Sequence, residues 1–296
     1  MRAKPILVAA AAALAVASIH AGQGSPAQQR LVFGTRTQGV LVDVLVTERN
    51  RPVAGLTAAD FELRDNGVLQ TIDSAEISDA PLNAVLALDV SGSTEGRRIT
   101  DLKAASAAFV DGLRARDRIA LTTFTHAVAP RVPLTEEFRS IGAALSALKP
   151  GGETAILDGV HVALMATQAE PGRSLVVVFT DGRDTMSWLQ DDEVVESAKR
   201  SNAVIYAVAT GRARSWQVLE DLADTTGGRA IEIETGADLH RQFERILQEF
   251  RSRYVLTFVP RGVPETGFHR LTVRAKRGGL AVKARPGYVA SGIDRP

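Results

Sequence analysis

The sequence predicts an α/β fold with a doubly wound, mostly parallel sheet, flanked on both sides by β-only segments. First, uncharged apolar runs such as residues 85–88 alternate with helix-compatible segments between residues 83 and 251. Such runs are typical of parallel strands buried on both faces. Second, strands that alternate with helices of this length indicate βαβ units. Third, the residues outside this region alternate apolar and polar side chains with a period of two, as expected for strands.

Length and composition narrow the class of protein. The 296 residues have room for one large or two modest domains. The chain has no Cys, which excludes disulfides, thiol catalysis, zinc–thiolate sites and iron–sulfur clusters. A formal net charge of +1 produces no overall field that would attract nucleic acid. We therefore expect no nucleic-acid partner.

The N-terminus has the pattern of an export signal. Arg2 and Lys4 precede an uncharged, Ala-rich run over residues 6–17, and we assign residues 1–21 as a signal peptide. A retained N-terminal anchor is the alternative, although the run is short for a membrane span. Residues 22–30 are polar and contain Gly and Pro, which predicts a flexible leader. We expect an exported protein, periplasmic, cell-surface or secreted, with no transmembrane span after signal cleavage.

The segment 31–82 predicts a small β module. Val side chains at alternate positions from 40 to 46 share one face of a strand. A turn around Pro52 and a helical turn over residues 57–60, capped by Thr57, follow. The sequence Asp65-Asn66-Gly67 then marks a hairpin that leads into further strands.

The segment 83–251 contains the alternating elements. We expect strands at residues 85–89, 118–124, 127–132, 175–180, 204–209 and 230–233, and helices at residues 97–113, 136–148, 157–168, 191–201, 216–224 and 237–251. The connection between residues 124 and 127 is too short for a crossover helix. The strand at 127–132 should therefore pair antiparallel, through a hairpin.

The segment 252–296 returns to β pattern, with strands at residues 254–260, 270–275 and 280–284. Neither this segment nor 31–82 could bury much apolar surface alone. Their charges are opposite: residues 251–296 hold ten basic and two acidic side chains, and residues 31–80 hold four basic and eight acidic. We therefore predict that the two flanks pair into one β-sandwich, with 83–251 inserted between its strands.

Oxygen-bearing side chains follow two of the buried strands. Asp89, Ser91 and Ser93 form an Asp-x-Ser-x-Ser loop, Asp181 ends a second strand, and Thr154 stands in a Gly-rich loop before a helix. Open α/β sheets bind ligands at the carboxyl ends of their strands. A set of hard oxygens without Cys or a nearby His suits Mg²⁺, Mn²⁺ or Ca²⁺ better than Zn²⁺. The alternative is that the two Asp side chains only cap the helices that follow.

These five residues match, in order and in position, the metal-ion-dependent adhesion site of the von Willebrand factor A (VWA) domain family, which this chain resembles. The resemblance implies that Ser91 and Ser93 ligate a cation directly and that Thr154 joins or leaves its shell. It implies that Asp89 and Asp181 act largely through bound waters, and that one metal position stays open to a partner's carboxylate. The most favoured cation is Mg²⁺.

The flanks carry a second resemblance. PVAGLTAADFELRDNG at residues 52–67 and ARPGY at residues 284–288 are similar to the flanks of the acidobacterial VWFA-related family of exported proteins. The likeness covers about residues 40–288. It bears on architecture more than on the ligand.

Two more acidic residues are candidates for a supporting role behind the metal ligands. Asp158 follows Thr154 by four positions, and Asp184 follows Asp181 by three. Asp158 could equally cap a helix, and Asp184 could be an exposed loop residue. Glu95 is interpreted as a solvated loop charge.

The predicted function is an exported, non-enzymatic, adhesion-type module that captures an Asp or Glu of a protein partner at a divalent cation. The sequence lacks a Gly-x-Ser-x-Gly elbow, a His-Glu-x-x-His motif and a Walker-type loop. Its His residues at 126, 161, 240 and 269 are scattered, and none stands beside a candidate nucleophile in the sequence. Two alternatives stay open: a metal-dependent hydrolase that uses the same oxygens, and a structural assembly subunit whose metal only rigidifies loops.

Overall fold

The computed structural model describes residues 39–168, 172–210 and 216–290. The predicted signal peptide (1–21) and leader (22–30) lie outside the described residues. In chain order the elements are β1 (Val40–Glu48), β2 (Arg51–Pro52), a 3₁₀ turn (Ala58–Asp60), β3 (Phe61–Asp65), β4 (Val68–Gln70), β5 (Ile72–Ile77), β6 (Leu82–Asp89), a 3₁₀ turn (Gly92–Thr94), α1 (Arg97–Asp111), β7 (Arg118–Phe124), β8 (Val128–Thr135), α2 (Phe138–Ala147), α3 (Ile156–Thr167), β9 (Arg173–Thr180), α4 (Asp191–Arg200), β10 (Ala203–Thr210), α5 (Trp216–Thr226), β11 (Arg229–Ile233), α6 (Gly236–Arg251), β12 (Tyr254–Phe258), β13 (Gly267–Ala275), β14 (Ala281–Ala284) and β15 (Gly287–Ala290).

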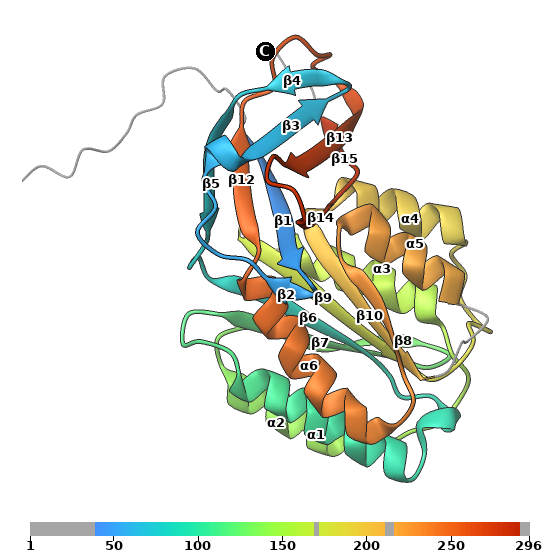
Figure 1. The fold of residues 1–296 in the computed structure, drawn as a ribbon. Helices are drawn as coiled ribbons and strands as arrows, with labels where there is room; N and C mark the ends of the chain where they lie inside the picture. Colours follow the sequence, from blue (N-terminus) through green and yellow to red (C-terminus); the bar gives the residue numbers. More distant parts are fainter. Residues whose placement is uncertain (1–38, 169–171, 211–215, 291–296) are drawn as a thin grey trace, which may run out of the picture. The chain divides into compact units, whose positions relative to one another are not determined.

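A six-stranded sheet forms the centre of the α/β region, in the order β11-β10-β9-β6-β7-β8 (Figure 1). All neighbours are parallel except β7 and β8, which form the predicted antiparallel hairpin. The chain runs outward from β6 in one direction to β7 and later returns to its other side as β9. The strand order therefore reverses between β6 and β9, and such switch points are where open α/β sheets bind ligands.

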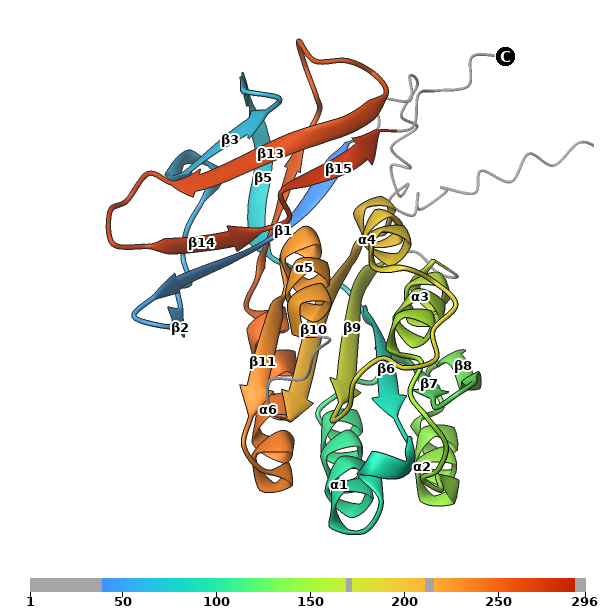
Figure 2. The ribbon, with the colours of Figure 1, turned by 90° about the vertical axis from the view of Figure 1, so that its right-hand side faces the viewer.

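Helices cover both faces of this sheet, as the prediction of a doubly wound sheet requires. Helices α1, α2 and α6 lie on one face, and α3, α4 and α5 lie on the other (Figures 1 and 2). Strand β6 shows why the sequence lacks charge here: Leu86 and Leu88 pack in the core with α1 and α6, whereas Val85 and Ala87 pack in the core with α3 and α5. Every residue of β6 is buried.

The predicted elements of the α/β region are confirmed, with shifted ends. The largest shifts are three residues long: β6 begins at Leu82 instead of Val85, and β8 runs to Thr135, through Pro133, instead of ending at Val132. Proline is tolerated because β8 is an edge strand, where one side of the backbone needs no partner. Its register with β7 also shifts twice. The helix after it begins at Phe138, two residues later than predicted.

The strands before and after the α/β region pair with one another. β1 lies between β12 and β14, and β12 also pairs with β5. In a second sheet, β13 lies between β3 and β15. One hydrophobic core joins Val44 of β1 and Leu63 of β3 to Leu256 of β12 and Leu271 of β13. The predicted hairpin between β3 and β4 is also confirmed, with Asn66 and Gly67 in left-handed backbone.

Arginines connect the flanking strands to the α/β region. Arg253 is fully buried and donates through Nη1 to the hydroxyl of Tyr206, at 2.9 Å. Arg285 donates to the carbonyl oxygens of Lys199 and Ser201, at 2.8 and 2.9 Å. Lys199 lies in the last turn of α4 and Ser201 is its C-cap residue, so these carbonyls stand where a helix lacks intrahelical donors. Among the described residues, no helix combines the length and hydropathy needed to cross a bilayer.

Candidate metal site

Three loops meet at the carboxyl ends of β6 and β9 and are joined by backbone hydrogen bonds. Gly92 N donates to Gly152 O, and Gly151 N donates to Val90 O, both at 2.9 Å. The loop after β9 joins them through Thr185 N, which donates to Thr154 O at 2.9 Å. The loops that carry the five predicted ligands are therefore held against one another by the main chain.

Asp89 lies at the base of the site and is fully buried. Its Oδ1 accepts a hydrogen bond from Ser91 N at 2.9 Å, and its Oδ2 accepts one from the Thr180 hydroxyl at 2.6 Å. Burial raises the pKa of the Asp89 carboxyl above its ordinary value, and hydrogen bonds from Ser91 and Thr180 oppose this rise. A nearby cation would favour the ionised carboxylate.

A chain of polar contacts runs from Ser91 to the third loop. The Ser91 and Ser93 hydroxyl oxygens lie 2.9 Å apart, and the Ser93 hydroxyl donates to Asp181 Oδ1 at 2.6 Å. Arg98 Nη1 donates to the other oxygen, Asp181 Oδ2, at 2.9 Å and to the carbonyl oxygen of Ser93 at 3.0 Å. Both oxygens of the Asp181 carboxylate therefore have protein partners.

Gly182 marks the point on which the site oxygens converge. A methyl group on its Cα would lie 3.4 Å from Thr154 Oγ1, 3.6 Å from Ser93 Oγ and 3.7 Å from Asp89 Oδ2. These three oxygens come from two loops and the end of β6, and they face one small space. The structure thus brings all five sequence-predicted residues together.

The donor set fits a small, hard cation. It consists of hydroxyl and carboxylate oxygens, which Mg²⁺, Mn²⁺ and Ca²⁺ prefer. Over residues 39–168, 172–210 and 216–290, no group of three His, Asp or Glu side chains is placed to hold a metal ion. A cation at this site would therefore depend on hydroxyls from Ser91, Ser93 and Thr154, with Asp89 and Asp181 supplying charge.

The two acidic residues predicted to support the site both hold the loop between β9 and α4. Asp158 accepts hydrogen bonds from Trp188 N and Leu189 N, each at 3.0 Å. Asp184 accepts from Leu157 N at 3.0 Å and from the Ser187 hydroxyl at 2.6 Å. Both carboxylates thus tie this loop to the first turn of α3. Their action behind a metal stays a prediction.

The same loop presents an apolar surface that sequence reasoning missed. Trp188 is 90% exposed, and Met186 is also exposed. Met186 N donates to the carbonyl oxygen of Thr154 at 3.1 Å, which attaches this surface to the loop of a predicted ligand. A Trp in a polar loop was the available signal, because large aromatic side chains are enriched at protein interfaces.

Arg98 and His126 were also missed. Arg98 is the second residue of α1, and its place just after the Asp-x-Ser-x-Ser loop was the available signal. His126 lies in the turn between β7 and β8. A Cβ on Gly152 would lie 2.5 Å from His126 Nδ1, so this exposed imidazole packs on a site loop. His126 therefore contacts a site loop, although it is distant from the predicted ligands in the sequence.

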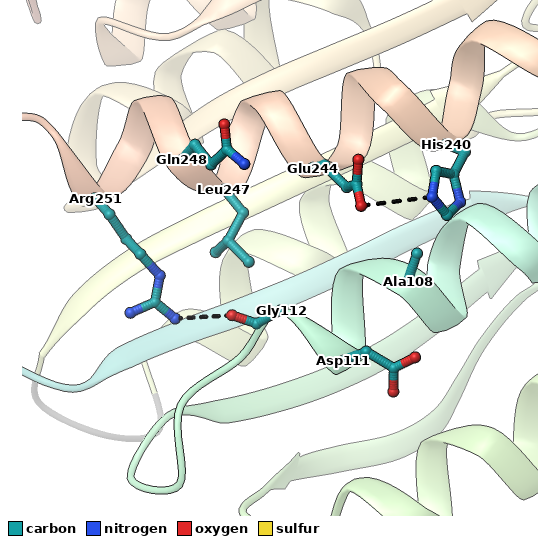
Figure 3. A pocket seen from close by; sticks show the side chains of 8 residues that line it. All are labelled: Ala108, Asp111, Gly112, His240, Glu244, Leu247, Gln248 and Arg251. Atoms are coloured by element: carbon teal, nitrogen blue, oxygen red, sulfur yellow. Dashed lines mark hydrogen bonds and ion pairs between the residues drawn. The ribbon is translucent and has the colours of Figure 1, made fainter.

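A shallow groove lies between α1 and α6, away from these loops (Figure 3). It encloses about 450 Å³ and includes His240 and Glu244, whose Nε2 and Oε1 atoms lie 3.5 Å apart. On the α1 side it is lined by Ala108, Asp111 and the C-cap residue Gly112, at the C-terminal end of that helix, whereas the site loops adjoin the N-terminal end. The groove contains none of the predicted ligands.

Two known proteins are similar to this chain in sequence. Human inter-alpha-trypsin inhibitor heavy chain H4 is 29% identical over 211 residues, which cover 65% of this chain and 22% of that protein. The uncharacterized protein sll0103 of Synechocystis is 28% identical over 177 residues, 57% of this chain and 41% of that protein. The chain thus spans less than half the length of either relative.

Two solved structures share the fold. A von Willebrand factor type A protein from Catenulispora acidiphila aligns with a TM-score of 0.54 and 14% identity, over 88% of this chain and 76% of that one. Proximal thread matrix protein 1 from the mussel byssus, with a zinc-occupied MIDAS motif, aligns with a TM-score of 0.53 and 17% identity, over 61% of this chain and 48% of that one.

The family model of the von Willebrand factor type A domain matches residues 83–245, which is more than half of the 296 residues. The match begins at the second residue of β6 and ends within α6, so it includes the central sheet and all three site loops. This chain belongs to the von Willebrand factor type A domain family.

Proposed function

We propose that this protein is a metal-dependent protein-binding module that holds a divalent cation among Asp89, Ser91, Ser93, Thr154 and Asp181. The observation that carries the proposal is the convergence of Thr154, Ser93 and Asp89 oxygens on the space beside Gly182. Membership of the von Willebrand factor type A family supports it. The hard oxygen donors favour Mg²⁺, with Mn²⁺ and Ca²⁺ as alternatives.

The chain's own residues would prepare the site in three ways. The Ser91, Ser93 and Thr154 hydroxyls would be direct ligands, and the buried Asp89 and Asp181 carboxylates would supply negative charge. Main-chain hydrogen bonds between the three loops keep these oxygens in register. The bound cation would supply a positive centre for a hard anionic ligand, and an exposed Asp or Glu of a protein partner is such a ligand.

The loop between β9 and α4 would add contact area beside the metal. Trp188 and Met186 are exposed, and Asp158 and Asp184 hold their loop to α3. A loop that is already held in place loses less conformational freedom on binding than a mobile loop would, which favours affinity. The partner would then combine an acidic residue with neighbouring apolar surface.

The wider setting of the module is also part of the proposal. Residues 31–82 and 252–296 form one β-sandwich, residues 83–251 are inserted in it, and a signal peptide directs export to the periplasm, cell surface or medium. The pairing of β1 with β12 and of β3 with β13 supports the shared sandwich. The flanking motifs, PVAGLTAADFELRDNG and ARPGY, support placement in the acidobacterial VWFA-related group.

A hydrolase is the second candidate, because His126 packs on the site loop at Gly152. A general base must reach a metal-bound water or the substrate. Metal-dependent turnover of ester or phosphoester substrates that disappears in a His126→Ala variant would favour this candidate over a binding module. We favour binding because the site oxygens adjoin an exposed aromatic surface.

Metal linkage tests the proposal directly. A ligand that binds only the folded state stabilises it by about 2.7 kcal/mol at one hundred times its Kd. We expect millimolar Mg²⁺ to raise the Tm measured by calorimetry, and Asp89→Ala or the Ser91→Ala/Ser93→Ala pair to remove this rise. The double Ser variant keeps the net charge, so it separates coordination from general electrostatics. Identical Tm values in Mg²⁺ and in chelator for the wild type would contradict the site.

A further inference from the structure

Arg98 is a cation already in contact with the candidate metal site. Its guanidinium lies 2.9 Å from Asp181 Oδ2 and 3.0 Å from the carbonyl oxygen of Ser93. The side chain of Asp181 is fully buried, whereas that of Arg98 is 55% exposed. A buried carboxylate needs a cationic or hydrogen-bonding partner, because leaving it unpaired is costly. Arg98 supplies the partner for Oδ2, and the Ser93 hydroxyl supplies that for Oδ1.

A divalent cation would draw on the same groups. It would use the Ser93 hydroxyl and the charge of Asp181, and Arg98 contacts both of these residues. Two positive charges near one carboxylate repel each other. The guanidinium is half-exposed on a flexible stem, so water can solvate it once it leaves Asp181. Arg98 can therefore withdraw into solvent when a bound cation replaces its charge beside the buried carboxylate.

We infer that Arg98 competes with the divalent cation for Asp181 and so sets the metal affinity of the site. The inference rests on the proposed metal-dependent function. In this arrangement Arg98 is a positioning residue: it pairs with the buried carboxylate, and metal binding requires the pair to loosen. The affinity for the cation is then lower than the five oxygens alone would provide.

The chain offers a matched set of variants. Arg98→Gln removes the charge and keeps most of the side-chain length, and Arg98→Lys keeps the charge. Arg97→Gln is the control, because Arg97 is the preceding residue, its side chain is 86% exposed and its ion-pair partner is Asp101, at 3.7 Å. It removes the same formal charge without removing a contact with Asp181.

The experiment is calorimetric titration of the full chain with Mg²⁺ and with Mn²⁺, together with the Tm in metal and in chelator. We expect Arg98→Gln to bind Mg²⁺ roughly tenfold more tightly, because the cation no longer has to displace a positive charge from Asp181. Arg98→Lys should stay within about threefold of the wild type, and Arg97→Gln should be unchanged because its charge is screened by solvent and salt.

Three results would overturn the inference. They are an unchanged affinity in Arg98→Gln, a weaker one, and an equal gain in Arg97→Gln and Arg98→Gln. A weaker affinity would mean that Arg98 orders the ligands, and an equal gain would mean that only overall charge matters. Absence of metal binding in every variant would instead contradict the proposed function itself. If Arg98→Gln binds the cation and the wild type does not, both the inference about Arg98 and the proposed function are supported.

Discussion

At the scale of single residues, the candidate site depends on the absence of a side chain at Gly182 as well as on its oxygen ligands. Gly182 leaves open the space onto which Thr154, Ser93 and Asp89 face. Its backbone is not in the left-handed region, so a larger residue is not excluded by backbone strain. We propose that position 182 lacks a side chain because a cation and its waters need this space.

The substitution Gly182→Ala tests this explanation. The added methyl would make an ordinary 3.4 Å contact with Thr154 Oγ1, so the fold should persist. A Mg²⁺ ion needs oxygen ligands at about 2.0–2.1 Å in near-octahedral geometry. We expect Mg²⁺ affinity to fall by roughly tenfold or more, equivalent to about 1.4 kcal/mol, in a calorimetric titration.

A second Gly→Ala change provides the control for this experiment. Gly142 lies within α2, and a Cβ there would meet no atom within 4 Å. Gly142→Ala should leave metal affinity unchanged and stabilise the helix by about 0.5–1 kcal/mol. If Gly182→Ala binds Mg²⁺ as tightly as the wild type does, the cation does not occupy this space.

At the scale of elements, two carboxylates hold the loop between β9 and α4 in place. Asp158, in the first turn of α3, accepts hydrogen bonds from the Trp188 and Leu189 amides. The loop thereby keeps a 90%-exposed Trp at a defined position near the site. We regard this loop as the part of the recognition surface that is independent of the metal.

The substitution Asp158→Ala should release this loop without unfolding the sheet. Each lost hydrogen bond to a charged group removes about 1.5–3 kcal/mol of local stability. We expect hydrogen exchange at the Trp188 and Leu189 amides to accelerate by roughly tenfold or more. Asp192→Ala is the control, because Asp192 accepts a hydrogen bond from the adjacent Glu193 N. If the Trp188 and Leu189 amides exchange equally fast in both variants, Asp158 does not hold this loop in place.

At the scale of the whole chain, the ARPGY motif connects the last strands to the α/β region. Arg285 donates to Ser201 O and Lys199 O, and Tyr288 donates to Asp65 Oδ2 at 2.8 Å. Gly287 is required by space, because a Cβ there would lie 2.4 Å from the carbonyl oxygen of His269. Burial lowers the pKa of Arg285 to about 10, so this side chain remains charged at neutral pH.

The substitution Arg285→Leu should destabilise the whole chain. It would leave the α4 carbonyls of Lys199 and Ser201 buried without this donor, at about 1–3 kcal/mol for each unsatisfied group. The substitution would also remove the desolvation penalty of the buried Arg285 guanidinium, which offsets part of this cost. We expect the free energy of unfolding in urea to fall by about 2–4 kcal/mol.

The control for this change is Arg277→Leu. Arg277 is exposed, and its nitrogen lies 3.8 Å from Glu48. Its replacement should change the free energy of unfolding by less than about 0.5 kcal/mol, as is usual for exposed ion pairs. Equal effects of the two substitutions would mean that the Arg285 contacts do not hold the flank to α4.

The sequence alone determined the order and type of the elements in the α/β region. It also determined which five residues stand at the ends of β6 and β9 and before α3. Both follow from local information: hydrophobic periodicity spans one element, and residues at strand ends meet at one edge of a parallel sheet. The extension of β8 through Pro133 was not predictable locally, because only the assembled sheet makes β8 an edge strand.

Only the tertiary structure decided how the remaining residues act. Arg98 and Asp181 are 83 positions apart, Arg285 and Ser201 are 84 apart, and Asp158 and Trp188 are 30 apart. No periodicity or short motif relates residues at such separations. Their pairing depends on how helices and loops pack, which fixes side-chain direction and burial. The sequence therefore identified the candidate ligands, whereas the fold identified the arginine that contacts them.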